Sequence, residues 1–531
     1  MTTTAPAPPQ TSASERVNTP WLGILGVFLG AGIATLNGRL LSVGLPDLRG
    51  ALGFGYDEAS WLPTALNMAM MFSGCFVVFL NIWYGPRKIL FPCAGIFTAA
   101  SALLPIATNY GFMVALLVIA GIASGTFYSL TMTFVAFNLP KRLIIFGIAA
   151  YAMDIVFVSN IASLMEGWYI EHLSWHWIFW TAAVVTPLMM VCVYFGMPRR
   201  AARDSSPSWH GFTYFSFGLA LIYGALDQGE RLDWLNSGVI VAMLAGGIFL
   251  LGAALVRRIW MPNPLLNLHL IRRNVIVLGL SIFAHRFVML STVMLIPAFL
   301  ATIQGYRPLE TGHTLVWSAV PMGAVVWIIA LATIQTNSRV ILAAGLTVSA
   351  VGCWVYSHVD PAWAGKNFEL VELFIMCGFA CSYIGLLGSI ILEALELGAL
   401  TSLTIAATYS SFMHFIRLFA GEMGVAFMGR VIAVREKYHS NVLGLHVQAG
   451  GWLTDERIRV LSGGLLPGST GPEAAHERAV EILSQQVRAQ AYTMAIADGF
   501  ILIGWMVVAY LLLMLFLRPS RFSYKDLRHM Q

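Results

Sequence analysis

The chain has 531 residues, of which 58% are hydrophobic and 11% are charged. Soluble globular chains carry about 25% charged residues, so this composition excludes a soluble multidomain enzyme, a disordered protein and a nucleic-acid binder. The formal net charge is +5, from 31 Lys and Arg against 26 Asp and Glu. Since each membrane span needs about 20 apolar residues, the length allows many transmembrane helices and little protein outside the bilayer.

Residues 1–20 are rich in Thr, Ala, Pro and Ser and hold few apolar side chains. This composition is typical of segments that cannot form a core, so we predict a disordered cytoplasmic tail. The tail has no charged region followed by a short apolar stretch and a cleavage site, so no signal peptide is expected. The first apolar run is therefore predicted to be a retained helix.

Apolar runs of about 18 or more residues predict membrane-spanning helices. The chain has fourteen such runs, and turn signals such as Asp360-Pro361 separate them. In chain order they cover residues 21–45, 59–82, 89–108, 112–137, 143–167, 175–196, 209–227, 237–256, 274–302, 312–334, 340–357, 368–394, 401–432 and 495–517.

The distribution of Lys and Arg over the connections predicts the orientation. With a cytoplasmic amino terminus, the cytoplasmic connections and tails hold 17 Lys and Arg, against four in the short outer loops. Cytoplasmic loops carry the excess of these residues in membrane proteins, so both termini are predicted to be cytoplasmic. Segment 433–494 then faces the outside, or the periplasm of a cell with two membranes. It is too short for a robust core of its own, and we expect a small helical cap.

Four stretches carry a family resemblance. Residues 36–46 read LNGRLLSVGLP, in the frame of L-D-x-T-I-V-N-V-A-L-P, and residues 60–65 read SWLPTA, similar to W-x-x-T-A-Y. Residues 173–179 read LSWHWIF, close to L-S-W-R-W-I-F, and residues 226–234 read LDQGERLDW, similar to the stretch between two extra central helices. The chain resembles the 14-span drug:proton antiporters of the major facilitator superfamily, the EmrB/QacA type, over nearly its whole length.

The resemblance implies an all-α polytopic membrane protein with the major facilitator fold and 14 transmembrane helices. Residues 21–196 would form one six-helix bundle, and residues 197–273 the two extra central helices. Residues 274–517 would form the second six-helix bundle, which includes the long outer loop 433–494. Residues 518–531 would be a cytoplasmic tail.

The chain also departs from the family at positions that usually function in proton coupling. Span 1 has Asn37 where the antiporters usually have an acid, and Arg39 where they have Thr. Leu117 replaces the arginine of R-x-x-Q-G in span 4, and residues 162–167 read ASLMEG in place of G-P-x-L-G-G in span 5. The scaffold is therefore antiporter-like, while its proton-coupling residues are expected to differ.

The connection after span 2 resembles the inner gate loop of the family, G-x-L-x-D-R-x-G-R-R. It keeps the glycine and the basic pair, as Gly85, Arg87 and Lys88, but has Ile82 in place of the acid. The resemblance assigns these three retained residues to an inner gate loop.

Several ionisable side chains fall inside the predicted spans, where each costs roughly 2.5–3.5 kcal/mol on insertion scales. Those away from the span ends are Arg39, Asp154, His285, Arg286, His414, Arg417 and Glu422, and Glu166 lies near the outer end of its span. Such residues commonly mark ion or substrate pathways, so we predict proton coupling for Asp154, Glu166 and Glu422. The alternative is that they form interhelical salt bridges that only fix packing.

The remaining candidates are predicted to line the substrate cavity. Arg39 needs a counter-charge, a cavity water or an anionic ligand; Asp154 or Glu166 could supply the counter-charge, but not both in the same state. Arg417 and Glu422 are expected to form a structural pair. The other cavity candidates are Asn37, Phe127, Tyr128, His285, Arg286 and His414, and for the aromatic pair packing alone is the favoured alternative.

No motif indicates an enzyme, a cofactor or a metal site. The chain lacks a G-x-x-x-x-G-K-[ST] phosphate loop, which argues against an ATP-driven pump, and it lacks H-E-x-x-H and G-x-S-x-G motifs. Its six cysteines all lie in apolar runs and are predicted to be buried small hydrophobes. Transport would therefore draw on an ion gradient or on the gradient of the substrate.

The sequence thus predicts a secondary active transporter of the cytoplasmic (inner) membrane that exports drugs or amphipathic metabolites by proton antiport and alternating access. Its partners would be a small-molecule substrate, protons, the lipid bilayer and a periplasmic adaptor protein that binds segment 433–494. One alternative is an exporter or facilitator of an anionic metabolite or siderophore, indicated by Arg39. Another, of a different class, is a non-transporting membrane sensor or scaffold.

Overall fold

The structure is a computed structural model that describes residues 19–137, 139–197, 209–260, 272–397, 403–518, 520 and 524–525. These residues form helices and short connections, and none of them forms a strand. Most of the predicted amino-terminal tail and most of residues 518–531 lie outside the described residues, as do the connections 198–208, 261–271 and 398–402.

The helices of the first half follow the predicted apolar runs closely. They are α1 (Pro20–Val43), α2 (Leu45–Leu52), α3 (Tyr56–Tyr84), α4 (Pro86–Leu103), α5 (Tyr110–Phe137), α6 (Ile144–His172), α7 (Trp177–Gly196), α8 (Trp209–Gly229) and α9 (Gly238–Trp260). Proline at the first helical position starts α1 and α4, where its missing N–H has no helical acceptor to lose. Gly85 joins α3 to α4 at φ +79°, which a residue with a Cβ rarely adopts.

The second half contains α10 (Arg273–Val288), a π-helical segment (Ser291–Leu295), α11 (Ile296–Ile303), α12 (Pro308–Gln335), α13 (Ser338–Tyr356), α14 (Gly365–Glu396), α15 (Leu403–Gly444), α16 (Trp452–Leu465) and α17 (Pro472–Met514). The predicted span 274–302 therefore has a π-helical segment within it. Short 3₁₀ turns complete the connections of both halves.

Within each half, neighbouring helices pack side by side. In the first half, α1 packs against α6 and α7, and α5 packs against α3 and α4. In the second half, α14 packs against α12 and α13, and α17 packs against α13 and α15. The pair α8 and α9 lies beside α3, outside this first group of helices.

The two halves meet along α6 with α12 and along α3 with α15. The α6–α12 crossing depends on two glycines. A Cβ on Gly167 would lie 2.4 Å from the Leu309 backbone nitrogen, and a Cβ on Gly312 would lie 2.3 Å from the Leu164 backbone nitrogen. The backbones approach this closely only because neither position carries a side chain.

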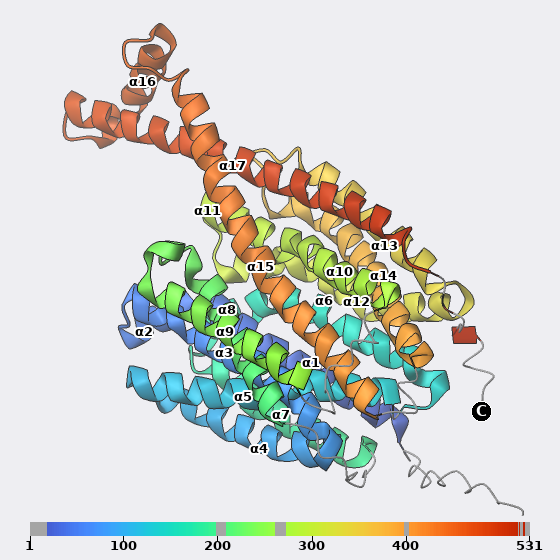
Figure 1. The fold of residues 1–531 in the computed structure, drawn as a ribbon. Helices are drawn as coiled ribbons and strands as arrows, with labels where there is room; N and C mark the ends of the chain where they lie inside the picture. Colours follow the sequence, from blue (N-terminus) through green and yellow to red (C-terminus); the bar gives the residue numbers. More distant parts are fainter. Residues whose placement is uncertain are drawn as a thin grey trace, which may run out of the picture.

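The two ends of the bundle differ (Figure 1). One end, the hairpin end, carries α2, the α8–α9 connection and the hairpin made by α15, α16 and α17, which projects beyond the other helices. The opposite end, the termini end, holds the start of α1 and the end of α17. The Gly167 and Gly312 crossing lies toward the hairpin end, since α6 ends and α12 begins there.

Segment 433–494 was predicted to be a loop that forms a helical cap, and in the structure helices α15 and α17 simply continue into it. Arg435 and His439 of α15 both contact the Asp498 carboxylate of α17, at 2.6 Å each. The polar residues 473–490 of this segment form the first part of α17. A span predicted from an apolar run ends where polar residues begin, whereas the helix continues as long as its backbone hydrogen bonds do.

Eleven described helical segments are long and apolar enough to cross a membrane. The helices α6, α8 and α15 occupy the other three predicted spans, and α6 contributes only the shorter apolar stretch Ile144–Asp154. The number of fourteen spans and the domain boundaries 21–196, 197–273 and 274–517 therefore stay predictions.

Candidate functional site

Ionisable and aromatic side chains from both halves meet where the halves face each other. We call this group the central cluster. Its members are Arg39 of α1, Tyr128 of α5, Tyr151 and Asp154 of α6, His285 and Arg286 of α10, Tyr383 of α14, and His414 and Arg417 of α15.

Tyrosine hydroxyls join the halves at the centre of this cluster. The hydroxyl oxygens of Tyr128 and Tyr383 lie 3.1 Å apart, within one hydrogen bond. The Tyr128 ring also contacts Tyr151, with centroids 4.4 Å apart, and His414, with centroids 5.2 Å apart. The Arg417 guanidinium lies over the Tyr128 ring, 3.2 Å from its centroid. Tyr128 is thus in contact with four other members of the cluster.

The cluster holds three arginines without an acidic partner. Among the described residues, none of Arg39, Arg286 and Arg417 forms an ion pair, and the Nε atom of each has no hydrogen-bond partner. Their charges repel one another, Arg286 acting on Arg39 and Arg417 acting on Arg286. All three keep part of their surface exposed. The site is therefore electropositive and has donors free for an anionic group.

Asp154 is the acid of this cluster. It is fully buried, and neither carboxyl oxygen has a hydrogen-bond partner in the described part of the chain. The carboxyl lies against Gly32 of α1, where an added Cβ would be 3.0 Å from Oδ1. Arg417 acts on it electrostatically from α15 without contacting it as an ion pair. An acid placed this way between the halves is suited to gaining and losing a proton.

The two histidines of the cluster are buried and lack hydrogen-bond partners among the described residues. His285 is 1% exposed and His414 is 6% exposed, and no ring nitrogen of either has a hydrogen-bond partner among the described residues. His285 stacks on Tyr383 at 5.2 Å between centroids, while His414 fits against Gly74, where a Cβ would lie 2.3 Å from Nε2. Both rings therefore present unused nitrogen atoms inside the protein.

Arg39 forms an ion pair with neither Asp154 nor Glu166 in the described structure. The Arg39 Nη2 atom donates instead to the Val293 carbonyl of the π-helical segment, at 3.5 Å. The structure also contains no ion pair between Arg417 and Glu422 within the described chain. Residues five apart on a helix point in different directions, which explains the absence of the second pair.

The two other predicted coupling acids lie outside the central cluster, each beside a second carboxylate. Glu166 has no exposed surface and faces Gly44 and Asp47 toward the hairpin end. Glu422 faces Tyr223 and Asp227 of α8. Two carboxylates this close repel each other unless one of them holds a proton. Both sites therefore suit a shared proton.

Of the remaining cavity candidates, Asn37 is buried in α1 and its Oδ1 has no hydrogen-bond partner among the described residues. Phe127 lies outside the central cluster. Its ring contacts Phe97 of α4 edge-on at 5.4 Å and is fully buried within the first half. Phe127 therefore contributes to packing, and Tyr128, the next residue, is the one that reaches the cluster.

Arg87 of the predicted inner gate loop contacts the end of α7, in the same half. The Arg87 Nη1 atom donates to the Met197 carbonyl at 3.3 Å, and the guanidinium lies 4.5 Å from the centroid of the Tyr194 ring. Gly85 supplies the turn before α4, and Lys88 is exposed. Arg87 thus anchors the α3–α4 turn to α7.

The sequence interpretation missed two acids that the structure places in polar networks. Asp227 of α8 accepts hydrogen bonds from Thr64 and from Gln228, the latter at 3.2 Å. Glu372 of α14 is fully buried and accepts from Thr292 at 2.6 Å. Both fall at the margin of a predicted span, where an acid normally reaches water, so their position concealed them.

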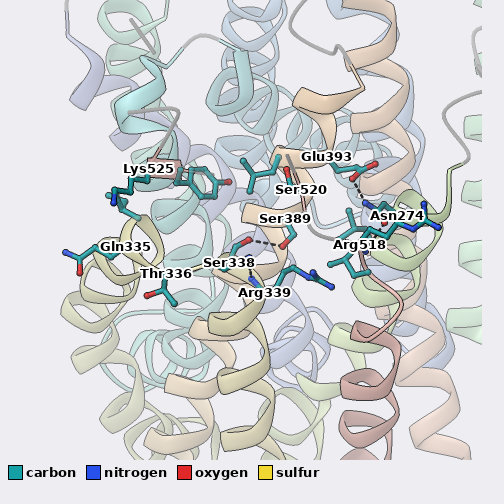
Figure 2. A pocket seen from close by; sticks show the side chains of 16 residues that line it. Asn274, Gln335, Thr336, Ser338, Arg339, Ser389, Glu393, Arg518, Ser520 and Lys525 are labelled. Carbon is teal, nitrogen blue, oxygen red and sulfur yellow. Dashed lines mark hydrogen bonds between the residues drawn. The ribbon is translucent and has the colours of Figure 1, made fainter. Parts of the chain in front are cut away.

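A separate cavity of about 190 Å³ lies at the termini end of the second half (Figure 2). Asn274 donates to the Glu393 carboxylate at 2.8 Å, and the Ser338 and Ser389 hydroxyls lie 3.1 Å apart. The Arg518 backbone N–H donates to the Asn274 side-chain oxygen at 3.2 Å. These polar groups satisfy one another and tie α10, α13, α14 and the end of the chain together. No group of His, Cys, Asp and Glu suited to a metal ion occurs in the described residues.

The chain is similar to known proteins over most of its length. The sequence profile of the Major Facilitator Superfamily matches residues 27–428. The probable multidrug resistance protein EmrY of Escherichia coli is 21% identical over 300 residues, which span 55% of this chain and 58% of EmrY. The multidrug export protein EmrB of Haemophilus influenzae is 22% identical over 80% of this chain and 82% of its own length. The solved proton:xylose symporter XylE aligns with 96% of this chain and 98% of its own, at 14% identity and a TM-score of 0.55.

Proposed function

Because the chain belongs to the major facilitator superfamily, we propose that it is a secondary transporter that exports drugs or other amphipathic small molecules in exchange for protons. The relatives EmrY and EmrB are named for multidrug resistance and export, which supports efflux. A polytopic transporter of this kind belongs in a bacterial inner membrane. Both termini are then cytoplasmic and the hairpin end faces the periplasm, in keeping with the Lys and Arg distribution.

The mechanism is alternating access, in which the two halves rock about a site between them. The central cluster takes the substrate, since it draws side chains from both halves. Contacts toward the hairpin end, at Gly167, Gly312 and Arg39, close that side in this conformation. Substrate release to the periplasm requires them to separate.

The observation that carries the proposal is the buried Asp154 carboxyl, which lies between the halves without a hydrogen-bond partner in the described chain. Taking an unpaired carboxylate out of water costs several kcal/mol, so a change in its surroundings changes whether it holds a proton. A substrate that binds one protonation state better shifts the equilibrium by that difference in affinity. Glu166 loads protons from the hairpin end, and Glu422 is the third coupling candidate.

Transport into proteoliposomes with an imposed pH gradient tests this proposal. Ethidium, a cationic aromatic dye, serves as one probe and anilinonaphthalene sulfonate, an anionic one, as the other. Asp154→Asn is expected to abolish gradient-driven export while dye binding stays measurable, and Glu166→Gln to give a weaker, pH-dependent defect. Asp455→Asn, an exposed acid on α16, is the matched control. Full proton-driven export by the Asp154→Asn, Glu166→Gln double variant would reject α6 as the coupling helix and point to Glu422.

A second candidate function is export of an anionic metabolite. It is favoured by the three arginines of the central cluster, which have no acidic partner within the described residues. Guanidinium groups bind carboxylates and phosphates through paired, planar hydrogen bonds. Arg39→Ala is therefore expected to weaken anilinonaphthalene sulfonate binding at least tenfold more than ethidium binding, and Arg39→Lys to restore little of it. Equal effects on both dyes would remove this candidate.

The hairpin is the proposed docking point for a periplasmic adaptor protein. Its tip exposes Trp452 and Leu453, at 77% and 72% of their surface, beyond the other helices. Exposed apolar side chains grouped in this way are typical of protein-binding surfaces. Site-specific photo-crosslinking from position 452 in cells tests the contact, and a crosslink only to lipid would reject it.

A further inference from the structure

A second buried acid lies in the C-terminal half, away from the central cluster. Glu372 of α14 has no exposed surface, and each of its carboxyl oxygens contacts a hydroxyl group. The Thr292 hydroxyl donates to Oε1 at 2.6 Å, and the Tyr356 hydroxyl oxygen lies 3.3 Å from Oε2. Among the described residues, no Lys, Arg or His forms an ion pair with it.

The hydroxyl groups beside Glu372 give its carboxyl group only one strong hydrogen bond, from Thr292 to Oε1 at 2.6 Å. Tyr356 has one hydroxyl hydrogen, and its two acceptors are the Phe368 carbonyl at 2.9 Å and Glu372 Oε2 at 3.3 Å. The nearer carbonyl takes most of this hydrogen bond, so Oε2 receives a weak one. With so little hydrogen bonding at a buried site, the neutral acid is more stable than the carboxylate.

The surroundings of Glu372 supply nothing that would compensate a negative charge. Of the helices that pack against α14, α13 contributes the titratable groups Tyr356 and Cys353, both of which are neutral when protonated. The described residues of α6, α10 and α12 contribute no charged group that acts on Glu372. A carboxylate buried without a cation costs several kcal/mol, so the neutral form fits this site.

The acid is linked to the other half through the π-helical segment Ser291–Leu295. Thr292 of this segment holds Glu372, and the carbonyl of the next residue, Val293, accepts from Arg39 of α1. Single π-helical turns are frequent at functional sites, because they contain an extra residue and disturb the regular hydrogen bonds. The segment thus contacts the protonated acid on one side and the N-terminal half on the other.

We propose that Glu372 is a second proton-binding site of the transporter and that it holds its proton while the hairpin end is closed. On deprotonation, the Tyr356 hydrogen turns from Phe368 to the carboxylate, and the hydrogen bond from Thr292 becomes charge-assisted and shorter. Proton loss at Glu372 therefore changes how α14 holds the π-helical segment, whose Val293 carbonyl contacts Arg39 of the other half. This consequence for transport rests on the proposed function, whereas the protonation of Glu372 does not.

Infrared difference spectroscopy measures the protonation directly. The full-length protein in lipid nanodiscs at neutral pH is compared with Glu372→Gln, whose amide group has nearly the same shape as a neutral carboxyl group and can still accept from Thr292. The wild-type spectrum is expected to contain a carboxylic-acid carbonyl band, shifted in heavy water, that Glu372→Gln lacks. Tyr356→Phe removes the hydroxyl group beside Oε2, so this band is expected to move without disappearing.

Glu369→Gln, a partly exposed glutamate on the same helix, is the matched control and is expected to lose carboxylate bands instead. Carboxylate bands in the Glu372 difference spectrum at neutral pH would overturn the proposal. A carboxylic-acid band together with wild-type, gradient-driven dye export by Glu372→Gln would reject the link to transport. If wild type exports no dye under a pH gradient, the proposed function fails, and the infrared result still decides the state of Glu372.

Discussion

A single methyl group at the α6–α12 crossing is expected to shift the protein toward the conformation that is open at the hairpin end. A Cβ on Gly312 would lie 2.3 Å from the Leu164 backbone nitrogen and 2.4 Å from its Cα atom, whereas ordinary contacts begin at 3.4 Å. Backbone atoms cannot rotate away, so α6 and α12 must separate by about 1 Å. Overpacking of this kind costs roughly 1–3 kcal/mol.

The overpacking cost of Gly312→Ala destabilises only the conformation in which the hairpin end is closed. The gain in helix propensity from Gly to Ala, about 1 kcal/mol, is the same whether the hairpin end is closed or open, and it cancels from that equilibrium. The clash exists only while the helices are in contact. Gly312→Ala should therefore favour the open conformation by roughly 5- to 150-fold.

Pulsed electron paramagnetic resonance (double electron–electron resonance) measures the distance between spin labels attached at Arg49→Cys and Lys366→Cys, which increases when the hairpin end opens. Both positions are exposed at the hairpin end, one on each half, and the background replaces the six native cysteines. Gly312→Ala is expected to increase the population at the longer label distance. Gly323→Ala on the same helix is the matched control, because its Cβ would contact only the end of Met153 at 3.8 Å. An unchanged distance distribution in Gly312→Ala would refute the assigned role of the crossing.

Two further predictions concern the hairpin end. Replacing about residues 445–488 by a short linker should leave membrane insertion at wild-type levels, because the removed part lies beyond the bundle; a drop in the membrane fraction measured by immunoblot would contradict this. The Trp234 indole N–H, and then Arg430, hold the pKa of Glu230 below its ordinary value. A lowered pKa stabilises the α8–α9 connection above the ordinary glutamate pKa, and this contribution is lost as the pH falls through the lowered value. The protection factors of the amides over residues 230–237, which are corrected for the intrinsic pH dependence of exchange, should therefore fall at acidic pH and should be low at every pH in Glu230→Gln. Wild-type protection factors that do not change with pH would count against the contact.

The helices could be predicted because the signal for a span is local. An apolar run of sufficient length has one stable arrangement in a bilayer, with all its backbone groups hydrogen-bonded within the helix. The same reasoning fails where residues become polar while the helix continues. The last residue of α15, Gly444, and the first residue of α17, Pro472, therefore lie outside the predicted spans. The π-helical segment lies within a continuous apolar run, and no pattern in that run distinguishes it from an α-helix.

The residues of the site were mostly identified, but their partners were not. The cost of a charge in a span singles out Arg39, Asp154 and Arg417 from sequence alone. Their contacts depend on how helices distant in sequence face each other, so Arg39 reaches a backbone carbonyl rather than an acid. Glu372 escaped notice because it lies near the start of a predicted span, where burial depends on the neighbouring π-helical segment and α13.

The central claim is that the buried acid at Asp154 exchanges its proton when substrate binds. Proton release on dye binding measures this most directly, with the full-length protein in weakly buffered detergent solution and a pH indicator. Addition of ethidium to wild type should release protons in proportion to the bound dye, because a cation near the carboxyl group favours its charged form, and Asp455→Asn should behave alike. Asp154→Asn should bind dye and release none. Equal release by Asp154→Asn, or dye binding to wild type without any release, would contradict the account.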